Sequence, residues 1–459
     1  MNKFAITAIT AGLAAAAKGP AMRGTNMGGW LVLEPWITPS LFYRFLGKKH
    51  SEGVGKDSYT VCEALGPEEG NKLMRAHWDT WVTEDIIKGL VDRGVEIVRL
   101  PIGDWTLKPY GPYVGCMDGA TEVIDGFLKM AEKYDIKVML DVHSVRGSQN
   151  GFDNSGIAHK TVWLDEDHYE HWGFQAGEWM GPWNGDSYDY IDFGNLQWAV
   201  DTIDGLLEEW GDYPAVYAIE PVNEPWEHTD LWALKLFYRN VRALMRRKQP
   251  RLQFVFHESF RYSADVWNDL FDDDDLHNVI LDTHIYQAWD PSKDSVQDVC
   301  QAWKDKTKEA AKIKYPVWVG EWALGTDACA FWLDGFNDSK TPRTDECLWV
   351  ECPHSYLPEE NAVDMDRDAY MQSPFGSNTL DVARYGMCPT DSARWTEEDM
   401  MTNGQCAITV FDHYAEAHFM WNFRTELEPK WSYIESYDAG WTKPVPADSE
   451  ARLSPLLLQ

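Results

Sequence analysis

The chain has 459 residues, of which 44% are hydrophobic, so it can bury a large core. Its 41 basic and 74 acidic side chains give a formal net charge of −33. A field of that sign repels nucleic-acid phosphates and anionic lipid headgroups, so we expect no nucleic-acid and no membrane partner, whereas a neutral ligand is unaffected.

Residues 1–17 have the proportions of a secretory signal. Lys3 supplies the positive start, the segment Phe4–Ala17 is apolar and small, and its last three alanines offer a cleavage site. We expect the mature chain to begin near Lys18 and to be secreted; an uncleaved apolar tail is the alternative. The run is too short to span a bilayer, and no later stretch is long enough for a transmembrane helix.

Eight short apolar runs rich in branched residues alternate with segments of helical spacing, in chain order along the whole sequence. Such alternation predicts an α/β fold, a (β/α)8 TIM barrel with long loops over its active face. An open doubly wound sheet is the alternative, but no Gly-rich phosphate loop follows any run. The expected strands are Arg23–Leu33, Ile97–Ile102, Lys137–His143, Val216–Glu224, Gln253–Ser259, Val279–Tyr286, Pro316–Trp322 and His418–Phe423, and the helical patterns are clearest in 78–91, 123–131, 198–207 and 234–244.

Two long irregular stretches, 144–195 and 325–405, interrupt this alternation. Loops of such length inside a compact domain are usually functional or covalently pinned, so we expect both to lie over the active face. Six of the eight cysteines fall between Cys300 and Cys406, which fits an exported protein whose insertion at about 325–405 is held by disulfides. Cys347 and Cys352 lack a second ligand pair, so we expect no metal. We predict one (β/α)8 domain, 18–459, with a small separate domain at 325–405 as the alternative.

Polar side chains stand at or near the ends of the expected strands, where a barrel gathers its chemistry. One buried histidine or arginine alone is usually structural, but their convergence at a single face indicates a site. The group consists of Glu34, Arg99, His143, Asn223, Glu224, His284, Tyr286, Glu321 and Trp421.

Two of these residues are carboxylates that terminate apolar runs, Glu224 and Glu321. A pair of carboxyl groups is the minimum equipment for breaking a glycosidic bond: one donates a proton and the other attacks the anomeric carbon. Arg99 would keep Glu321 charged, and Tyr286 could hydrogen-bond the same oxygen. Asn223 is a residue type suited to a sugar 2-hydroxyl.

Several motifs resemble the fungal-type exo-β-1,3-glucanases of glycoside hydrolase family 5. They are Gly24–Phe42 (which includes Gly-Gly-Trp-Leu-Val-Leu-Glu-Pro-Trp), Gly147–Gly156 (Gly-Ser-Gln-Asn-Gly-Phe-Asp-Asn-Ser-Gly), Val222–Pro225 (Val-Asn-Glu-Pro) and Val319–Trp322 (Val-Gly-Glu-Trp). The resemblance extends from about Arg23 to Trp431.

This resemblance implies that Glu224 is the acid/base and Glu321 the nucleophile of a retaining enzyme without cofactors. It implies that Arg99, His143, Asn223, His284 and Tyr286 surround the reacting atoms. It also implies terminal-glucose contacts from Glu34, Asp153, Asn154 and Trp421, and an aromatic clamp on the next sugar from Phe152 and Trp289. The chain departs from the family pattern at Phe423 and Arg424, where a Trp and a Lys are usual, and in the length of the 325–405 insertion.

The expected function is therefore hydrolysis of terminal β-1,3-linked glucose from a β-glucan substrate by a secreted or cell-wall monomer. Alternatives within the family are an endo-β-1,3-glucanase, a β-1,6-glucanase, a lipid or steryl β-glucosidase and a transglucosylase. An inactive glucan-binding barrel is an alternative from another class, but the two glutamates with their supporting Arg, Asn and Tyr argue against it.

Overall fold

The computed structural model describes residues 20–444 except 159–161, 164–168, 171–176, 185, 290–292, 328, 334, 337–346, 367, 370–386 and 393. The expected signal segment, 1–17, lies outside these residues. No helix in the described part of the chain is both long enough and apolar enough to cross a membrane.

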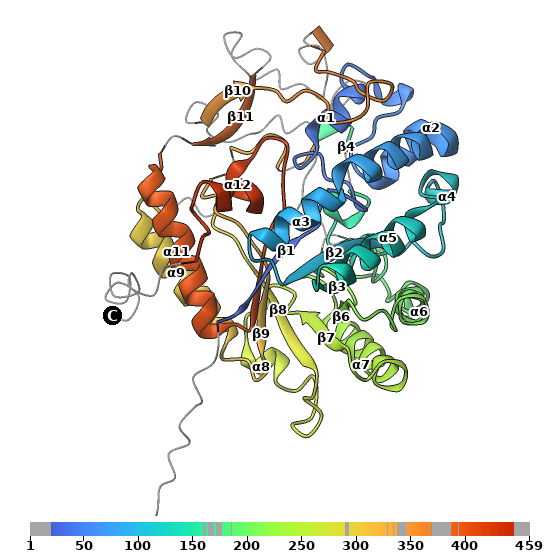
Figure 1. Ribbon diagram of the computed structural model, residues 1–459. Coiled ribbons are helices and arrows are strands. Elements are labelled where there is room, and N and C mark those ends of the chain that lie inside the picture. Colours follow the sequence, from blue (N-terminus) through green and yellow to red (C-terminus); the bar gives the residue numbers. More distant parts are fainter. Residues whose placement is uncertain are drawn as a thin grey trace, which may run out of the picture.

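Eight parallel strands close into a barrel, which confirms the predicted fold (Figure 1). Around the barrel their order is β1-β12-β9-β8-β7-β6-β3-β2. In chain order the strands are β1 (Met22–Asn26), β2 (Ile97–Gly103), β3 (Lys137–Ser144), β6 (Val216–Glu220), β7 (Gln253–His257), β8 (Val279–Ile285), β9 (Val317–Trp322) and β12 (Ala417–Met420).

Helices surround the strands and bury apolar stripes against them. In α7, for example, Asp230 caps the first turn by accepting from the Ala233 backbone NH, and Leu234, Phe237 and Val241 are buried. The longer helices are α2 (Ser58–Trp81), α3 (Glu84–Asp92), α5 (Ala120–Lys133), α6 (Phe193–Glu209), α7 (Leu231–Lys248), α9 (Val296–Ala310) and α11 (Glu397–Tyr414), and the shorter ones are α1 (Pro39–Phe42), α4 (Tyr113–Cys116), α8 (Ala264–Trp267) and α12 (Tyr433–Asp438).

The barrel interior is packed by a small apolar cluster, separate from the larger core between strands and helices. Because successive strand residues face opposite sides, residues two positions further along each strand lie in the next interior layer. That next layer is polar: Arg99 follows Ile97, Asp141 follows Met139, and Glu220 follows Ala218. The apolar layer consists of Ile97, Met139, Ala218, Val255, Ile280, Trp318, Ala417 and Phe419.

Four disulfides are present, and the described residues include no free cysteine. Two of them, Cys329–Cys347 and Cys352–Cys388, lie within the 325–405 insertion, so Cys347 and Cys352 belong to different bridges. The other two, Cys62–Cys116 and Cys300–Cys406, join α2 to α4 and α9 to α11. The insertion forms a hairpin of β10 (Cys347–Glu351) and β11 (Met387–Ser392) at the same end of the barrel as α1 (Figure 1).

Candidate active site

Three predicted site residues lie beyond the strands at whose ends the sequence placed them. β1 ends at Asn26, so Glu34 belongs to the loop of residues 27–38 that leads to α1. β6 ends at Glu220, so Asn223 and Glu224 follow it in a turn. The expected strand ends at Leu33 and Glu224 were therefore wrong, because buried apolar residues in a tightly packed loop have the same sequence pattern as a strand. Glu224 adopts a φ of 41°, which is uncommon for a residue other than glycine and is often found at functional sites.

The remaining members of the polar group lie where the sequence placed them. Arg99, His143, His284 and Glu321 are in β2, β3, β8 and β9. Tyr286 and Trp421 immediately follow β8 and β12. The register of β8 against β9 shifts between Thr283 and His284, and this pairs His284 with Glu321.

Arg99 organises the layer beneath the two glutamates and is fully buried. Its Nη1 donates to Glu321 Oε1 at 2.8 Å, and its Nη2 donates to Asn223 Oδ1 at 2.7 Å. Its Nε donates to Glu220 Oε2 at 2.8 Å, and Asp141 Oδ2 lies 3.1 Å from Nη2. Burial alone would lower the pKa of Arg99, but the surrounding carboxylates raise it above its ordinary value, so this guanidinium stays charged.

Glu321 is held by both of its oxygens. Oε1 accepts from Arg99, and Oε2 accepts from the hydroxyl of Tyr286 at 2.7 Å. Burial raises the pKa of Glu321 above its ordinary value and the charge of Glu224 adds to this effect, whereas His284 and Arg99 oppose it. The two hydrogen bonds fix the direction of the carboxylate and leave it 3% exposed.

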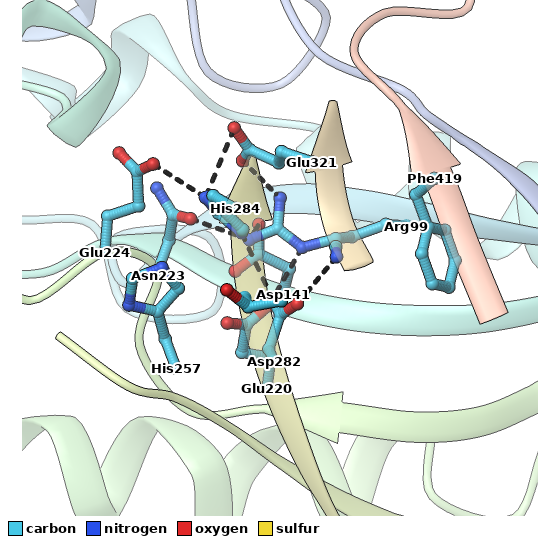
Figure 2. Close-up of polar contacts among 12 residues, drawn as sticks. Arg99, Asp141, Glu220, Asn223, Glu224, His257, Asp282, His284, Glu321 and Phe419 are labelled. Atoms are coloured by element: carbon cyan, nitrogen blue, oxygen red, sulfur yellow. Dashed lines mark hydrogen bonds and ion pairs between the residues drawn. The ribbon is translucent and has the colours of Figure 1, made fainter. Parts of the chain in front are cut away.

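Glu224 and Glu321 share one neighbour, the Nδ1 nitrogen of His284 (Figure 2). Nδ1 lies 2.6 Å from Glu224 Oε1 and 3.4 Å from Glu321 Oε2. The distance between these two carboxylate oxygens therefore cannot exceed the sum of their distances to Nδ1, about 6.0 Å.

His284 is a protonated imidazole in these surroundings. Burial would lower its pKa, but the charges of Glu321, Asp282 and Glu224 raise it well above the ordinary value. Its Nε2 lies 3.2 Å from Asp282 Oδ2, so each ring nitrogen faces a carboxylate. Burial would also raise the pKa of Glu224, but the charge of His284 and its hydrogen bond lower it. Glu224 and His284 thus hold one proton between them.

Asn223 and His143 are oriented by the same network. His143 Nδ1 lies 2.6 Å from Asp141 Oδ2, so it carries the ring hydrogen and Nε2 accepts from Asn223 Nδ2 at 3.3 Å. With Oδ1 bound to Arg99, the Asn223 amide has a fixed direction. The ring of His143 also stacks on Trp421, with centroids 5.2 Å apart and planes 11° apart.

The residues predicted to bind a terminal sugar gather near the two glutamates. Burial raises the pKa of Glu34 well above its ordinary value, and the charges of Asp153, Glu321 and Glu224 add to this effect. Glu34 Oε2 accepts from Trp36 Nε1 at 3.0 Å. Among the described residues, Glu34 Oε1 and Asn154 Oδ1 are buried without a hydrogen-bond partner. Such oxygens are suited to accept from ligand hydroxyls.

The two predicted clamp residues belong to two aromatic groups. Phe152 packs edge to face on Trp226, with centroids 5.1 Å apart. Trp289 contacts Tyr286 and Trp431, at 5.5 and 6.0 Å. That the two rings grip one sugar stays a prediction.

Phe423 and Arg424, the two residues that differ from the family pattern, contact α2. The Arg424 guanidinium lies 3.8 Å from the centre of the Trp81 ring and donates to the Trp81 carbonyl at 2.6 Å. Phe423 meets the same ring edge to face, with centroids 5.8 Å apart.

Several residues of this site were missed by sequence reasoning. They are Asn26, Asp141, Glu220 and Asp282 in the layer beneath the glutamates, and Trp36, Trp226 and Trp431 among the aromatic residues. Three of them, Asp141, Glu220 and Asp282, could have been found as charged residues inside otherwise apolar strands, because a buried charge needs a partner.

Two groups of buried carboxylates and imidazoles bring possible metal-ligand atoms within 4.8 Å of one another. Both include His284, and protonated imidazole has no lone pair for a metal. These carboxylates and imidazoles therefore fit a hydrogen-bonded network better than a metal site.

Comparisons with known proteins agree with this geometry. The family model for cellulase (glycosyl hydrolase family 5) matches residues 62–364. A glucan 1,3-beta-glucosidase of Blumeria graminis is 32% identical over 448 residues, covering 93% of this chain and 88% of that protein. A glucan 1,3-beta-glucosidase of Yarrowia lipolytica is 28% identical over 435 residues, covering 91% and 87%. Among solved structures, a rutinosidase from Aspergillus niger shares the fold, with a TM-score of 0.61 at 18% identity over 93% of this chain and 98% of that one.

Proposed function

The chain belongs to glycosyl hydrolase family 5, and on that basis we propose that it is a retaining exo-β-1,3-glucosidase. It removes terminal β-1,3-linked glucose from glucans through a covalent glucosyl-enzyme intermediate. Its similarity to proteins known as glucan 1,3-beta-glucosidases supports the linkage, and the residues at the strand ends supply the chemistry.

The distance between the two glutamates is the observation that carries the proposal. Retaining glycosidases separate their carboxyl groups by about 5–5.5 Å, whereas inverting ones leave about 6.5–9.5 Å for a water molecule. Because Glu224 Oε1 and Glu321 Oε2 contact the same nitrogen of His284, their separation has an upper bound of about 6.0 Å. This bound falls short of the inverting range, so one carboxylate attacks the sugar directly.

We assign the attack to Glu321 and proton transfer to Glu224. Both oxygens of Glu321 accept hydrogen bonds, from Arg99 and Tyr286, which orient the nucleophile toward one face of the sugar. Glu224 lies 2.6 Å from the protonated His284 Nδ1, so the proton that the leaving oxygen needs is available at Glu224 Oε1. Once the leaving group has departed, the same carboxylate accepts a proton from the incoming water.

The sugar is held by groups already oriented for it. Asn223 Nδ2 is directed by the Arg99 contact and is suited to a 2-hydroxyl, whose hydrogen bond strengthens in the transition state. Trp421 offers an indole supported from behind by His143. Glu34, Asp153 and Asn154 supply carboxylate and amide oxygens for the outer hydroxyls, and Phe152 and Trp289 contact the next sugar.

A time course of products from laminarin tests the function. The proposal predicts glucose as the only early product, released as the β-anomer, as followed by NMR. Early oligosaccharides would indicate endo action, and α-glucose would indicate inversion. A parallel assay with a β-1,6-glucan and a steryl glucoside separates the related activities.

We also propose that the protein works outside the cell as a monomer. The four disulfides and the signal-like segment 1–17 support export. N-terminal sequencing of secreted protein tests this: a chain starting near Lys18 is expected, and a chain that still starts at Met1 contradicts it. Size-exclusion chromatography tests the oligomeric state.

A further inference from the structure

The side chain of Tyr356 joins the disulfide-bonded insertion to α2. The Tyr356 hydroxyl lies 2.6 Å from Nδ1 of His77, and its ring packs against Trp81 with centroids 4.9 Å apart. Both His77 and Trp81 are buried in α2. Tyr356 therefore joins the insertion to the barrel through a polar contact inside an aromatic cluster.

The direction of this hydrogen bond follows from the other nitrogen of His77. His77 Nε2 lies 2.9 Å from the carbonyl oxygen of Trp30, and a carbonyl can only accept, so Nε2 carries the ring hydrogen. Burial lowers the pKa of His77 to about 3, so the ring is neutral and Nδ1 is an acceptor. The Tyr356 hydroxyl thus donates to His77, and His77 donates to Trp30.

Trp30 belongs to the loop of residues 27–38, which also carries Glu34 and Trp36. Helix α1, which follows the loop, and the 3-10 turn Tyr43–Phe45 after it make further contacts with the insertion. Phe42 packs on Phe336 and Tyr43 packs on Trp332, with centroids 5.7 and 6.2 Å apart. Arg44 Nη2 also donates to the Asn361 carbonyl at 2.8 Å. The insertion is thus linked to the chain on both sides of Glu34: to Trp30 through His77, and to α1 and the turn that follow the loop.

We propose that Tyr356 is a positioning residue for the terminal-sugar site and acts on Glu34 through His77 and the loop 27–38. This inference rests on the proposed function, in which Glu34 binds hydroxyls of the terminal glucose. Glu34 Oε2 accepts from Trp36 Nε1, a group of the same loop, and Oε1 is buried without a hydrogen-bond partner among the described residues, so the position of the carboxylate is set by the loop. A loop released at Trp30 would move this oxygen relative to the sugar.

The test is Tyr356→Phe, which removes the hydroxyl and keeps the ring. We expect KM to rise about fivefold, as for the loss of one neutral hydrogen bond, with kcat little changed. The rise should be equal for an aryl β-glucoside and for laminarin, because both present the same terminal glucose. His77→Gln interrupts the relay from the other side and should raise KM similarly. Tyr134→Phe is the matched control, since it removes a tyrosine hydroxyl bound to Glu84 on the outer helices.

A double-mutant cycle with Glu34→Gln separates positioning from a general structural effect. If Tyr356 acts through Glu34, Tyr356→Phe should have no further effect on KM in the Glu34→Gln background. An unchanged KM in Tyr356→Phe, or the same factor in both backgrounds, would overturn the proposal, whatever happens to the melting temperature. Failure of the native protein to hydrolyse either substrate would instead refute the proposed function.

Discussion

Trp289 meets Tyr286 edge to face, with ring centroids 5.5 Å apart, while the hydroxyl of Tyr286 donates to Glu321. Trp289 is nevertheless 52% exposed. The Trp289 indole thus packs on the tyrosine that binds the nucleophile, while about half of its surface remains exposed to solvent. This arrangement suits a sugar bound next to the cleavage point, because the flat face of an indole matches the apolar face of a pyranose.

Trp289→Ala should raise KM for laminarin about tenfold and change KM for an aryl β-glucoside by less than about twofold, since an indole contact is worth on the order of 1 kcal/mol. The aryl leaving group is already aromatic and reactive, so it depends less on the second sugar site. Steady-state kinetics on both substrates measure the effect. Equal losses on both would mean that Trp289 only packs the rim of the barrel against Trp431.

Most of the eight strands could be predicted because they are short apolar runs buried on both faces, and an alternation of strands and helices is compatible with few folds. The first strand is an exception, since β1 is Met-Arg-Gly-Thr-Asn and the apolar residues that suggested it follow in the loop. Arg99, His143, His284 and Glu321 were found because they lie at or near the ends of such runs. Glu34 and Glu224 were recognised as site residues but assigned to the wrong elements. Burial of Leu31, Val32 and Leu33 in a loop looks the same in sequence as burial in a strand.

The contact of Arg99 with Glu321 was expected from the sequence, whereas Tyr286 binds the other oxygen of Glu321 rather than the same one. The remaining partners of Arg99 could not be predicted, because they depend on how the barrel closes. Arg99 is far in sequence from Glu220 and Glu321, and only strand order brings them within 2.8 Å. The anchoring of the insertion is a similar case. Nothing in the sequence around Tyr356 indicates His77, which lies 279 residues away.

His284→Gln should move the acidic limb of the kcat/KM profile to higher pH. The charge of His284 lowers the pKa of Glu321, so without this charge Glu321 takes up a proton at a higher pH. His257→Gln is the matched control, because burial lowers the pKa of this neighbouring histidine and keeps it uncharged. A limb that stayed in place in His284→Gln, or shifted equally in both variants, would contradict the proposed electrostatics.

Glu258 should make the protein more stable in acid than in alkali. Burial raises its pKa to about 8, above the ordinary 4.5, so the folded state binds this proton more tightly than the unfolded chain. The stabilisation is complete below pH 4.5 and is lost as the pH rises through 8, by on the order of 4 kcal/mol. Glu258→Gln mimics the protonated acid, so its unfolding free energy should fall less between pH 5 and pH 8.

Chemical denaturation at several pH values checks this expectation. Glu360→Gln, at an exposed position, is the control and should keep the native slope. Parallel pH dependence in the native protein and in Glu258→Gln would show that Glu258 does not hold a proton in the folded state.

Removal of the Cys300–Cys406 bridge should lower the free energy of unfolding by about 2–5 kcal/mol. This bridge spans 106 residues, whereas Cys329–Cys347 spans 18, so the double Ser variant of the former should lose more stability. Denaturant titrations compare the two. Thiol titration of the denatured, unreduced protein should find no free thiol, and eight thiols would refute all four bridges.

The roles of Glu224 and Glu321 are the central claim, and the stereochemistry of azide rescue tests them most directly. In Glu224→Ala an activated aryl glucoside still forms the glycosyl-enzyme at Glu321, and azide needs no general base to attack it. The account predicts restored turnover and a β-glucosyl azide. In Glu321→Ala azide can act only from the opposite face and should give the α-glucosyl azide. The reverse pattern of products would exchange the two roles, and full activity in either variant without azide would contradict the mechanism.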